Sequence, residues 1–304
     1  MDFMRTPPRS IGILHHPRKP DSLSLAGEMG EFLLARGCTI WSGSAWDEPE
    51  ALSHVAGLDL LITLGGDGTM LRAARIGSRS GVPILGIKLG RVSFLAEVQP
   101  DDWRTPLENL LEGQYWLEER MLLDVDVAAG DASPAVENPE AGPRRRSSMI
   151  PGQPNHTYTA LNDVVISRGG IARLIAIDTW VDQSYLTTYR ADGVIVATPT
   201  GCTGYALAAG GPILPPELKN ILLLPICPHL SLDRSVILSQ GSTVSFEIHA
   251  DHPAILTVDG QSEIALAEGD RVEVRASKHV SHFVHLLDRA YFYRTLMDRL
   301  RWAG

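Results

Sequence analysis

The sequence predicts an α/β plus all-β chain: a doubly wound, Rossmann-like N-terminal domain followed by a C-terminal domain of the β-sandwich type. The chain has 304 residues, which at about 100–200 residues per domain allows two domains. Up to about residue 90, apolar strand-like runs alternate with helical spacing, a pattern typical of a parallel sheet. From about residue 120, runs rich in β-branched residues follow one another, which predicts a mostly β domain.

The first domain is expected over residues 1–118. Its strand-like runs cover residues 11–14, 38–41, 58–64 and 83–87, and helical spacing predicts helices that end at Gly37 and Gly77. The segment GGDG, residues 65–68, follows the third run and opens the second helix. Ligands of doubly wound sheets bind beyond the carboxyl ends of the strands, so this GGDG loop lies where a ligand is expected.

The second domain is expected over residues 119–285. Its strand-like runs cover residues 122–127, 159–167, 175–181, 193–197, 243–250, 255–258 and 271–276. The segment from about 130 to 156 is dense in Pro, Gly, Ser and Glu, which predicts a long, mobile surface loop. Leucine and aromatic residues at helical spacing predict a C-terminal helix over 286–304 that packs back on the first domain.

Composition excludes several classes of protein. The formal net charge of -9 argues against a nucleic-acid binder, which needs a basic footprint to neutralise phosphates. The longest apolar runs, such as 221–224, are far shorter than the ~20 residues that span a bilayer, and the N-terminus has no secretory apolar region. The three cysteines, Cys38, Cys202 and Cys227, form no C-x-x-C pair, which favours reduced thiols. We therefore expect a cytoplasmic protein without a membrane partner.

The GGDG loop combines a tight glycine turn with one carboxylate at the start of a helix. Glycine allows close backbone approach, and a helix N-terminus offers free N–H groups, so the loop suits a phosphate. Asp67 would repel that phosphate unless Mg²⁺ or a substrate hydroxyl lies between them, which makes it a candidate general base or metal contact. The alternative is a plain strand-to-helix turn. The P-loop pattern is absent, and Leu71 stands where G-x-G-x-x-G needs its last glycine.

A second cluster runs from Tyr189 to Gly193 and from Thr198 to Pro212. It brings hydroxyl groups, backbone donors and the ring of Tyr205 to the end of a strand, an inventory that suits a nucleotide. A structural crossover with an ordinary core tyrosine is the alternative. The pairs Asn162-Asp163 and Asp259-Gly260 could each be turns on their own.

Together these segments resemble the NAD kinase family, within the wider group that shares a GGDG loop with diacylglycerol and sphingosine kinases. The matching stretches lie in the family's order over residues 60–261: LGGDGTMLRAAR, GIKLGRVSFLAE, LNDVVISR, YRADGVIVATPTGCTGYALAAGGPIL, LLPICPHLSLDR and LTVDGQ. GGDG alone is shared with the lipid kinases, whereas TPTGCTGYALAAGGP together with VDGQ is far more specific.

The resemblance implies transfer of the γ-phosphoryl of ATP to the 2′-hydroxyl of the adenosine ribose of NAD, with Mg²⁺ or another divalent cation. It implies that Asp67 is the general base. The residues that it implies for nucleotide binding are Gly66, Asp67, Gly68, Arg72, Asn162, Asp163, Arg190, Asp192, Thr200, Thr203, Gly204, Tyr205, Ala206, Leu207, Ala208 and Gln261. Similar enzymes are homodimers or homotetramers, so a homo-oligomer is expected.

The sequence departs from the family pattern at Lys88, Ser93, Cys202 and Gly204. Cys202 stands where serine is usual, so a phosphate contact at this position loses a strong hydroxyl donor. Two other functions stay open. A lipid kinase would leave the VDGQ and TPTGCTGY segments unexplained, and a non-catalytic NAD(P) sensor would gain little from a carboxylate facing phosphates. Inorganic polyphosphate is an alternative donor to ATP.

Overall fold

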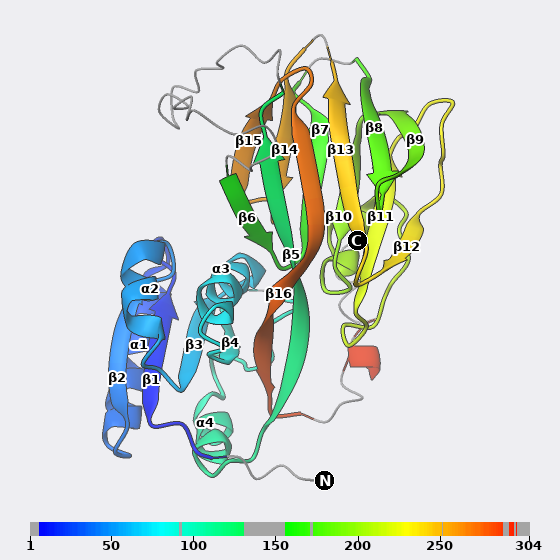
Figure 1. The fold of residues 1–304 in the computed structure, drawn as a ribbon. Coiled ribbons are helices and arrows are strands. Elements are labelled where there is room, and N and C mark those ends of the chain that lie inside the picture. The colour runs from blue at the N-terminus through cyan, green and yellow to red at the C-terminus, as the bar shows by residue number, and fades with distance from the viewer. Residues whose placement is uncertain are drawn as a thin grey trace. The chain divides into compact units, whose positions relative to one another are not determined.

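A computed structural model describes residues 6–90, 93–130, 156–170, 173–250, 252–287, 292–294 and 296. The chain divides into two compact units, of which unit 1 comprises Met1–Arg120 with His279–Gly304 and unit 2 comprises Met121–Lys278. Strands β5 (Trp116–Ala128) and β16 (Arg271–His285) each contribute residues to both units (Figure 1). The predicted loop at 130–156 and the predicted helix at 286–304 lie almost wholly outside the described residues.

Unit 1 contains a parallel sheet in the order β2-β1-β3-β4, which β16 extends through the pair Phe283 and Ile84. Its strands are β1 (Ser10–His15), β2 (Thr39–Ser44), β3 (Leu60–Gly65) and β4 (Ile84–Lys88). Its helices are α1 (Pro20–Leu34), α2 (Glu48–Val55), α3 (Asp67–Ser78) and α4 (Arg104–Leu111).

Helices cover both faces of this sheet. Met29 of α1 and Leu107 of α4 share a buried cluster with alternate strand residues such as Ile62. Helix α3 packs on the opposite face of the sheet. There the hydroxyl of Thr63, on β3, donates to the sulfur of Met70, on α3, at 2.8 Å. Each fully buried aliphatic side chain contributes about 1.5–3 kcal/mol. The doubly wound α/β prediction is therefore confirmed.

Unit 2 consists of two antiparallel arrangements of strands that share one core. The first has the order β12-β11-β10-β7-β14-β15. Its strands are β7 (Asp163–Arg168), β10 (Gly193–Ala197), β11 (Asn220–Ile226), β12 (Val236–Ser239), β14 (Ala254–Val258) and β15 (Ser262–Leu266). The second joins β16-β13-β8-β9 and also pairs β5 with β16 and β6. The strands new here are β6 (His156–Ala160), β8 (Ile175–Val181), β9 (Ser184–Ala191) and β13 (Thr243–His249).

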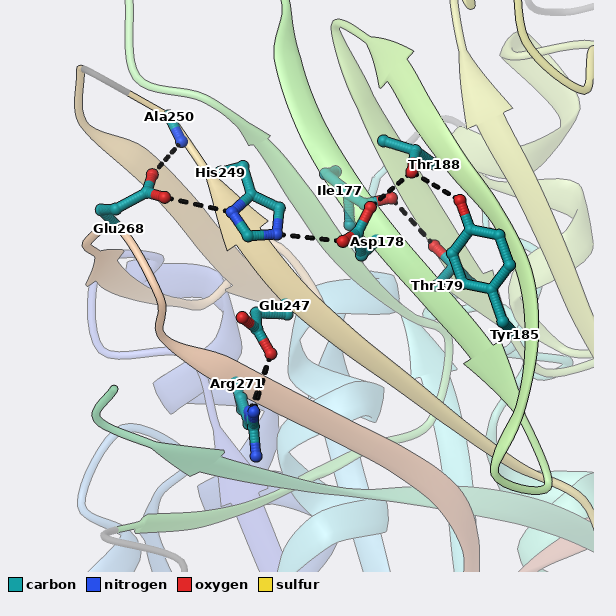
Figure 2. Close-up of polar contacts among 10 residues, drawn as sticks. All are labelled: Ile177, Asp178, Thr179, Tyr185, Thr188, Glu247, His249, Ala250, Glu268 and Arg271. Carbon is teal, nitrogen blue, oxygen red and sulfur yellow. Dashed lines mark hydrogen bonds and ion pairs between the residues drawn. The ribbon is translucent and has the colours of Figure 1, made fainter. Parts of the chain in front are cut away.

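Strand alternation builds the core of unit 2. Phe246 and Ile248 of β13 are buried in the same cluster as Val164 of β7 and Val194 of β10, so the two sheets face each other as a sandwich. The residues of β13 that alternate with Phe246 and Ile248 carry polar groups, as Glu247 and His249 show (Figure 2). His249 lies between the carboxylates of Asp178 and Glu268, 3.1 Å from each, and Glu247 pairs with Arg271 at 2.9 Å (Figure 2). The β-sandwich prediction is also confirmed.

Some boundaries differ from the sequence prediction. The run at 159–167 is two strands, β6 and β7, because the backbone between them turns to donate the amides of Leu161 and Asn162 to the Asp259 carboxylate. Helix α2 has eight residues, too few for a clear period, and begins at a cap in which Asp47 accepts the Glu50 amide. Within the described part of the chain, no helix combines the length and the apolar character needed to cross a membrane.

Candidate functional site

The GGDG loop forms an open turn between β3 and α3. Gly66 has extended backbone angles, and a Cβ atom built on it would meet no atom of the described residues, apart from its two chain neighbours, within 4 Å. At Gly65, by contrast, a Cβ would lie 2.0 Å from the hydroxyl oxygen of Thr69. Helix α3 has twelve residues, which is long enough for its peptide dipoles to add up. Its N-terminus therefore favours an anion. The turn therefore leaves room for a phosphate close to the backbone of Gly66.

The carboxylate of Asp67 is held by the segment that follows β4. Its Oδ1 accepts the Ser93 hydroxyl and the amide of Leu95 at 3.2 Å, and its Oδ2 accepts the amide of Phe94 at 3.0 Å. The side chain is half-buried at the first position of α3. An acid with a fixed orientation at an open turn can take a proton from a hydroxyl that binds beside it.

Cationic and aromatic side chains lie at the carboxyl ends of the neighbouring strands. The Arg72 guanidinium lies 4.6 Å from the ring centroid of Trp46, and the ring of His16 lies 4.3 Å from the same ring. Burial, with help from Arg75, lowers the pKa of Arg72, and its Nε has no hydrogen-bond partner among the described residues. The Arg72 guanidinium is therefore suited to an anionic ligand. Lys88, the last residue of β4, pairs in register with Gly65 at the same edge.

A second turn, at the end of β10 in unit 2, is packed tightly. The hydroxyl of Thr198 accepts the Gly201 amide at 3.1 Å, and the amide of Thr198 donates to the Asn162 carbonyl at 2.9 Å. A Cβ built on Gly201 would lie 2.1 Å from that same carbonyl oxygen. Cys202 is fully buried and its sulfur accepts the Leu214 amide at 3.0 Å, so this thiol faces the protein interior.

Two carboxyl groups meet beside this turn. Asp259 accepts the amides of Leu161, Asn162 and Asp163 at 2.7–3.2 Å. Burial and, next, the charge of Asp259 raise the pKa of Asp163 to about 7. The side-chain oxygen of Asn162 is buried without a hydrogen-bond partner among the described residues, and Asp163 Oδ2 would lie 3.8 Å from a Cβ at Gly204. A buried acid with a raised pKa and a buried amide oxygen therefore lie on consecutive residues beside this turn.

The remaining predicted residues after this turn differ in exposure. Thr200 and Ala206 are buried, the latter in a core cluster with Leu222 of β11. Tyr205 opens the short helix α5 (Tyr205–Ala208) and is 47% exposed, so its ring is accessible for stacking. Thr203, Leu207 and Gln261 are half-buried, and Gly204 and Ala208 are exposed.

Arg190 and Asp192 do not join this group. Asp192 pairs with Arg168 at 2.8 Å, and Arg190 is exposed on β9. Strand β10 separates Asp192 from the turn at Thr198, and its five residues span roughly 16 Å at about 3.3 Å per residue. Asp259 was predicted from its own neighbours only as part of a turn, and its positive φ of 52° confirms the turn. The hydrogen bond that its carboxylate accepts from the Asn162 amide has no local sequence signal.

Other features of the structure lie apart from the predicted residues. A cavity of about 460 Å³ in unit 2 is lined by residues that include Trp180, Phe246 and Arg271, and none of the predicted site residues lines it. No group of three or more His, Cys, Asp or Glu side chains in the described ranges is arranged to hold a metal ion. Mg²⁺ that arrives with a nucleotide is held largely by phosphate oxygens and water, which needs no such protein cage.

The chain is similar to NAD kinases by family models and by sequence identity. Residues 48–115 match the model of the ATP-NAD kinase N-terminal domain, and residues 161–286 match that of the ATP-NAD kinase C-terminal domain. The chain is 39% identical over 291 residues to an NAD kinase of Chloroflexus aurantiacus, covering 96% of this chain and 98% of that relative. It is 35% identical over 293 residues to an NAD kinase of Dehalococcoides mccartyi, covering 96% of each.

Solved structures share the fold. Yeast NADH kinase, crystallised with NADH, aligns with a TM-score of 0.75 at 24% identity and covers 97% of this chain and 89% of its own. An NAD kinase from Archaeoglobus fulgidus, crystallised with ATP, aligns with a TM-score of 0.73 at 23% identity and covers 97% of this chain and 100% of its own.

Proposed function

Because the chain belongs to the NAD kinase family, we propose that it transfers the γ-phosphoryl of ATP to the 2′-hydroxyl of the adenosine ribose of NAD. The products are NADP and ADP. The named relatives align over nearly their full length, which supports the same reaction for the whole chain. The observation that carries the chemistry is the oriented carboxylate of Asp67 at the open turn of Gly66.

In the proposed reaction, Asp67 takes the proton of the 2′-hydroxyl. The ribose oxygen forms a bond to the γ-phosphorus while the bond from that phosphorus to the β,γ-bridging oxygen breaks, and ADP leaves with the electron pair. A ribose hydroxyl is a poor nucleophile, so a carboxylate within hydrogen-bond reach contributes about 10²–10⁴-fold. The N-terminus of α3, with Gly66 and Gly68, and the guanidinium of Arg72 would hold the phosphates. Mg²⁺, when bound to ATP, would neutralise charge on the transferring group.

Unit 2 supplies the proposed contacts to NAD. Asn162 and Asp163 would bind ribose or base edges, because an unpartnered amide oxygen and a protonatable acid can accept and donate hydrogen bonds there. Tyr205 would stack on a ring, and Thr200, the segment 203–208 and Gln261 would line the nucleotide. Any nucleotide contact of Arg190 and Asp192 would lie at the opposite end of β10 from Asn162.

The phosphoryl donor, the cellular location and the oligomeric state are further parts of this proposal. ATP is the proposed donor, with inorganic polyphosphate as its alternative. A cytoplasmic homo-oligomer, a dimer or tetramer, is proposed from the resemblance to similar enzymes.

An NADP-formation assay tests the function. Wild-type protein with NAD, ATP and Mg²⁺ is coupled to an NADP-specific dehydrogenase, with Asp67→Asn in parallel. We expect NADP from the wild type, a kcat about 10²–10⁴-fold lower in the variant, and NAD binding retained in both. Folded wild type that binds NAD without forming NADP would instead favour the sensor. Phosphorylation of diacylglycerol in place of NAD would favour the lipid kinase.

A further inference from the structure

The hydroxyl of Ser93 points in a direction that its neighbours determine. Its oxygen accepts the amide of Ala96 at 2.8 Å and that of Leu95 at 3.3 Å. A serine hydroxyl has one proton and two acceptor positions. The Ala96 amide occupies one position, and the Leu95 amide, whose proton is shared with Oδ1 of Asp67, lies at the other. The remaining proton is donated to Oδ1 of Asp67. The side chain is 5% exposed, so little water competes for this proton.

The segment that carries Ser93 is anchored to the sheet. Val98 donates its amide to the Gly86 carbonyl at 3.3 Å and accepts the Lys88 amide at 2.9 Å. Since Gly86 and Lys88 belong to β4, the donors to Asp67 are tied to a central strand of unit 1. A hydroxyl placed in this way can hold a carboxylate in one rotamer.

The two oxygens of Asp67 are loaded unequally. Within the described part of the chain, Oδ1 accepts the Ser93 hydroxyl and the amides of Phe94 and Leu95, both at 3.2 Å. Oδ2 accepts the Phe94 amide at 3.0 Å. The Phe94 proton is shared between the two oxygens, and the Leu95 proton is shared between Oδ1 and the Ser93 hydroxyl. A carboxylate oxygen offers about two lone-pair positions, so Oδ1, which also accepts the Ser93 proton, is the more fully occupied, and Oδ2 retains capacity for a further partner.

We propose that Ser93 is a positioning residue for phosphoryl transfer, because its hydroxyl occupies Oδ1 of Asp67 and leaves Oδ2 to take the proton of the acceptor hydroxyl. This inference rests on the proposed function of Asp67. Removing the hydroxyl leaves only the amides of Phe94 and Leu95 to orient the carboxylate, which widens its range of orientations. Small misplacements of a reacting group reduce turnover strongly. Ser93→Ala is expected to lower kcat about tenfold and to leave KM for NAD and ATP within about twofold.

The test compares four proteins in the NADP-formation assay, each with its thermal melting measured. Ser93→Ala removes the donor and Ser93→Thr keeps a hydroxyl. Ser78→Ala is the matched control, because Ser78 is equally buried in unit 1 and its hydroxyl donates to the Arg75 carbonyl at 3.1 Å. We expect Ser93→Thr to recover most of the lost kcat and Ser78→Ala to retain wild-type kinetics.

A double variant keeps the test decisive if Ser93→Thr does not fold. If Ser93 acts through Asp67, Ser93→Ala should lower kcat about tenfold in the wild type and change little in the Asp67→Asn background. An equal tenfold loss in both backgrounds, or an unchanged kcat in Ser93→Ala, would overturn the inference while the wild-type activity stands. A wild type that forms no NADP would instead overturn the proposed function, and this inference with it.

Discussion

The turn at Gly66 in unit 1 and the turn at Gly201 in unit 2 both follow a buried strand and both open a helical segment. Their surroundings are opposite. A Cβ at Gly201 would lie 2.1 Å from the Asn162 carbonyl oxygen, whereas a Cβ at Gly66 would meet no atom of the described chain, other than its neighbours in sequence, within 4 Å. The packing of the chain therefore requires glycine at 201 and does not require it at 66.

This contrast separates two uses of glycine that look alike in sequence. At Gly201 the missing side chain lets one segment of the protein approach another, which fixes Asn162 and Asp163 beside the turn. At Gly66 the missing side chain leaves space that no part of the described chain fills within 4 Å. We interpret that space as room for a phosphate of the donor nucleotide.

The largest effect on stability is expected from Gly201→Ala. The added methyl group meets backbone atoms, which cannot rotate away as a flexible side chain would, so the turn must move. We expect the free energy of unfolding to fall by more than about 3 kcal/mol, measured by urea denaturation. Gly27→Ala is the control, because a Cβ there meets nothing within 4 Å on α1 and alanine favours a helix. Wild-type stability in Gly201→Ala would contradict the required close approach.

An effect of comparable size, but dependent on pH, is expected from Asp163→Asn. The pKa of Asp163 is raised to about 7 by burial and by Asp259, while an unfolded aspartate has a pKa near 3.9. The folded state therefore holds the proton more tightly, and this stability is present below about pH 4 and is lost as the pH rises through 7. The variant avoids the loss, so it should gain up to about 4 kcal/mol relative to wild type between pH 4 and pH 8.

The unfolding free energies of wild type and Asp163→Asn are compared at several pH values between about 4 and 8. A constant difference between wild type and Asp163→Asn from pH 4 to pH 8 would show that Asp163 does not bind its proton more tightly in the folded protein.

The smallest effect is expected at the polar face of unit 2 shown in Figure 2. The hydrogen bond to Glu268, with Asp178 also contributing, raises the pKa of His249 despite partial burial. Its contribution is present below the unfolded pKa of about 6.5 and is lost as the pH rises through the folded value. The side chain is 37% exposed, so screening limits the effect of His249→Gln to less than about 1 kcal/mol. A larger loss at pH 9 than at pH 5.5 would contradict this assignment.

The strands of the fold could be predicted where burial shapes the sequence. Strands β1, β3 and β4 are buried apolar runs between turn residues, and β2 is a partly exposed edge strand. All four were expected within a few residues of their observed bounds. Strands β9, β12 and β15 lie at sheet edges, where fewer side chains are buried and the alternation is weak. No pattern in the sequence therefore indicated them. Strand β11 was also missing from the predicted strands, although it is an apolar run that is buried almost throughout.

The candidate site could be predicted only in its local parts. Asp67 lies inside a glycine turn whose chemistry can be interpreted from five consecutive residues. Its contact with Ser93 joins positions 26 apart, and the contact of Asp259 with Asn162 joins positions 97 apart. Such contacts depend on how the strands are brought together, and neither hydrophobic spacing nor turn propensity contains that information.

Gly66→Ala tests whether the open turn at Gly66 binds the phosphoryl donor, through unfolding and NADP formation measured on the same preparation. We expect an unfolding free energy within about 1 kcal/mol of wild type, because the added methyl group meets no atom of the described residues, other than its chain neighbours, within 4 Å. We also expect a loss of at least about tenfold in kcat/KM for ATP, because the methyl group occupies the space of the phosphate. Wild-type kcat/KM in the folded variant would contradict the claim that this turn binds the phosphoryl donor.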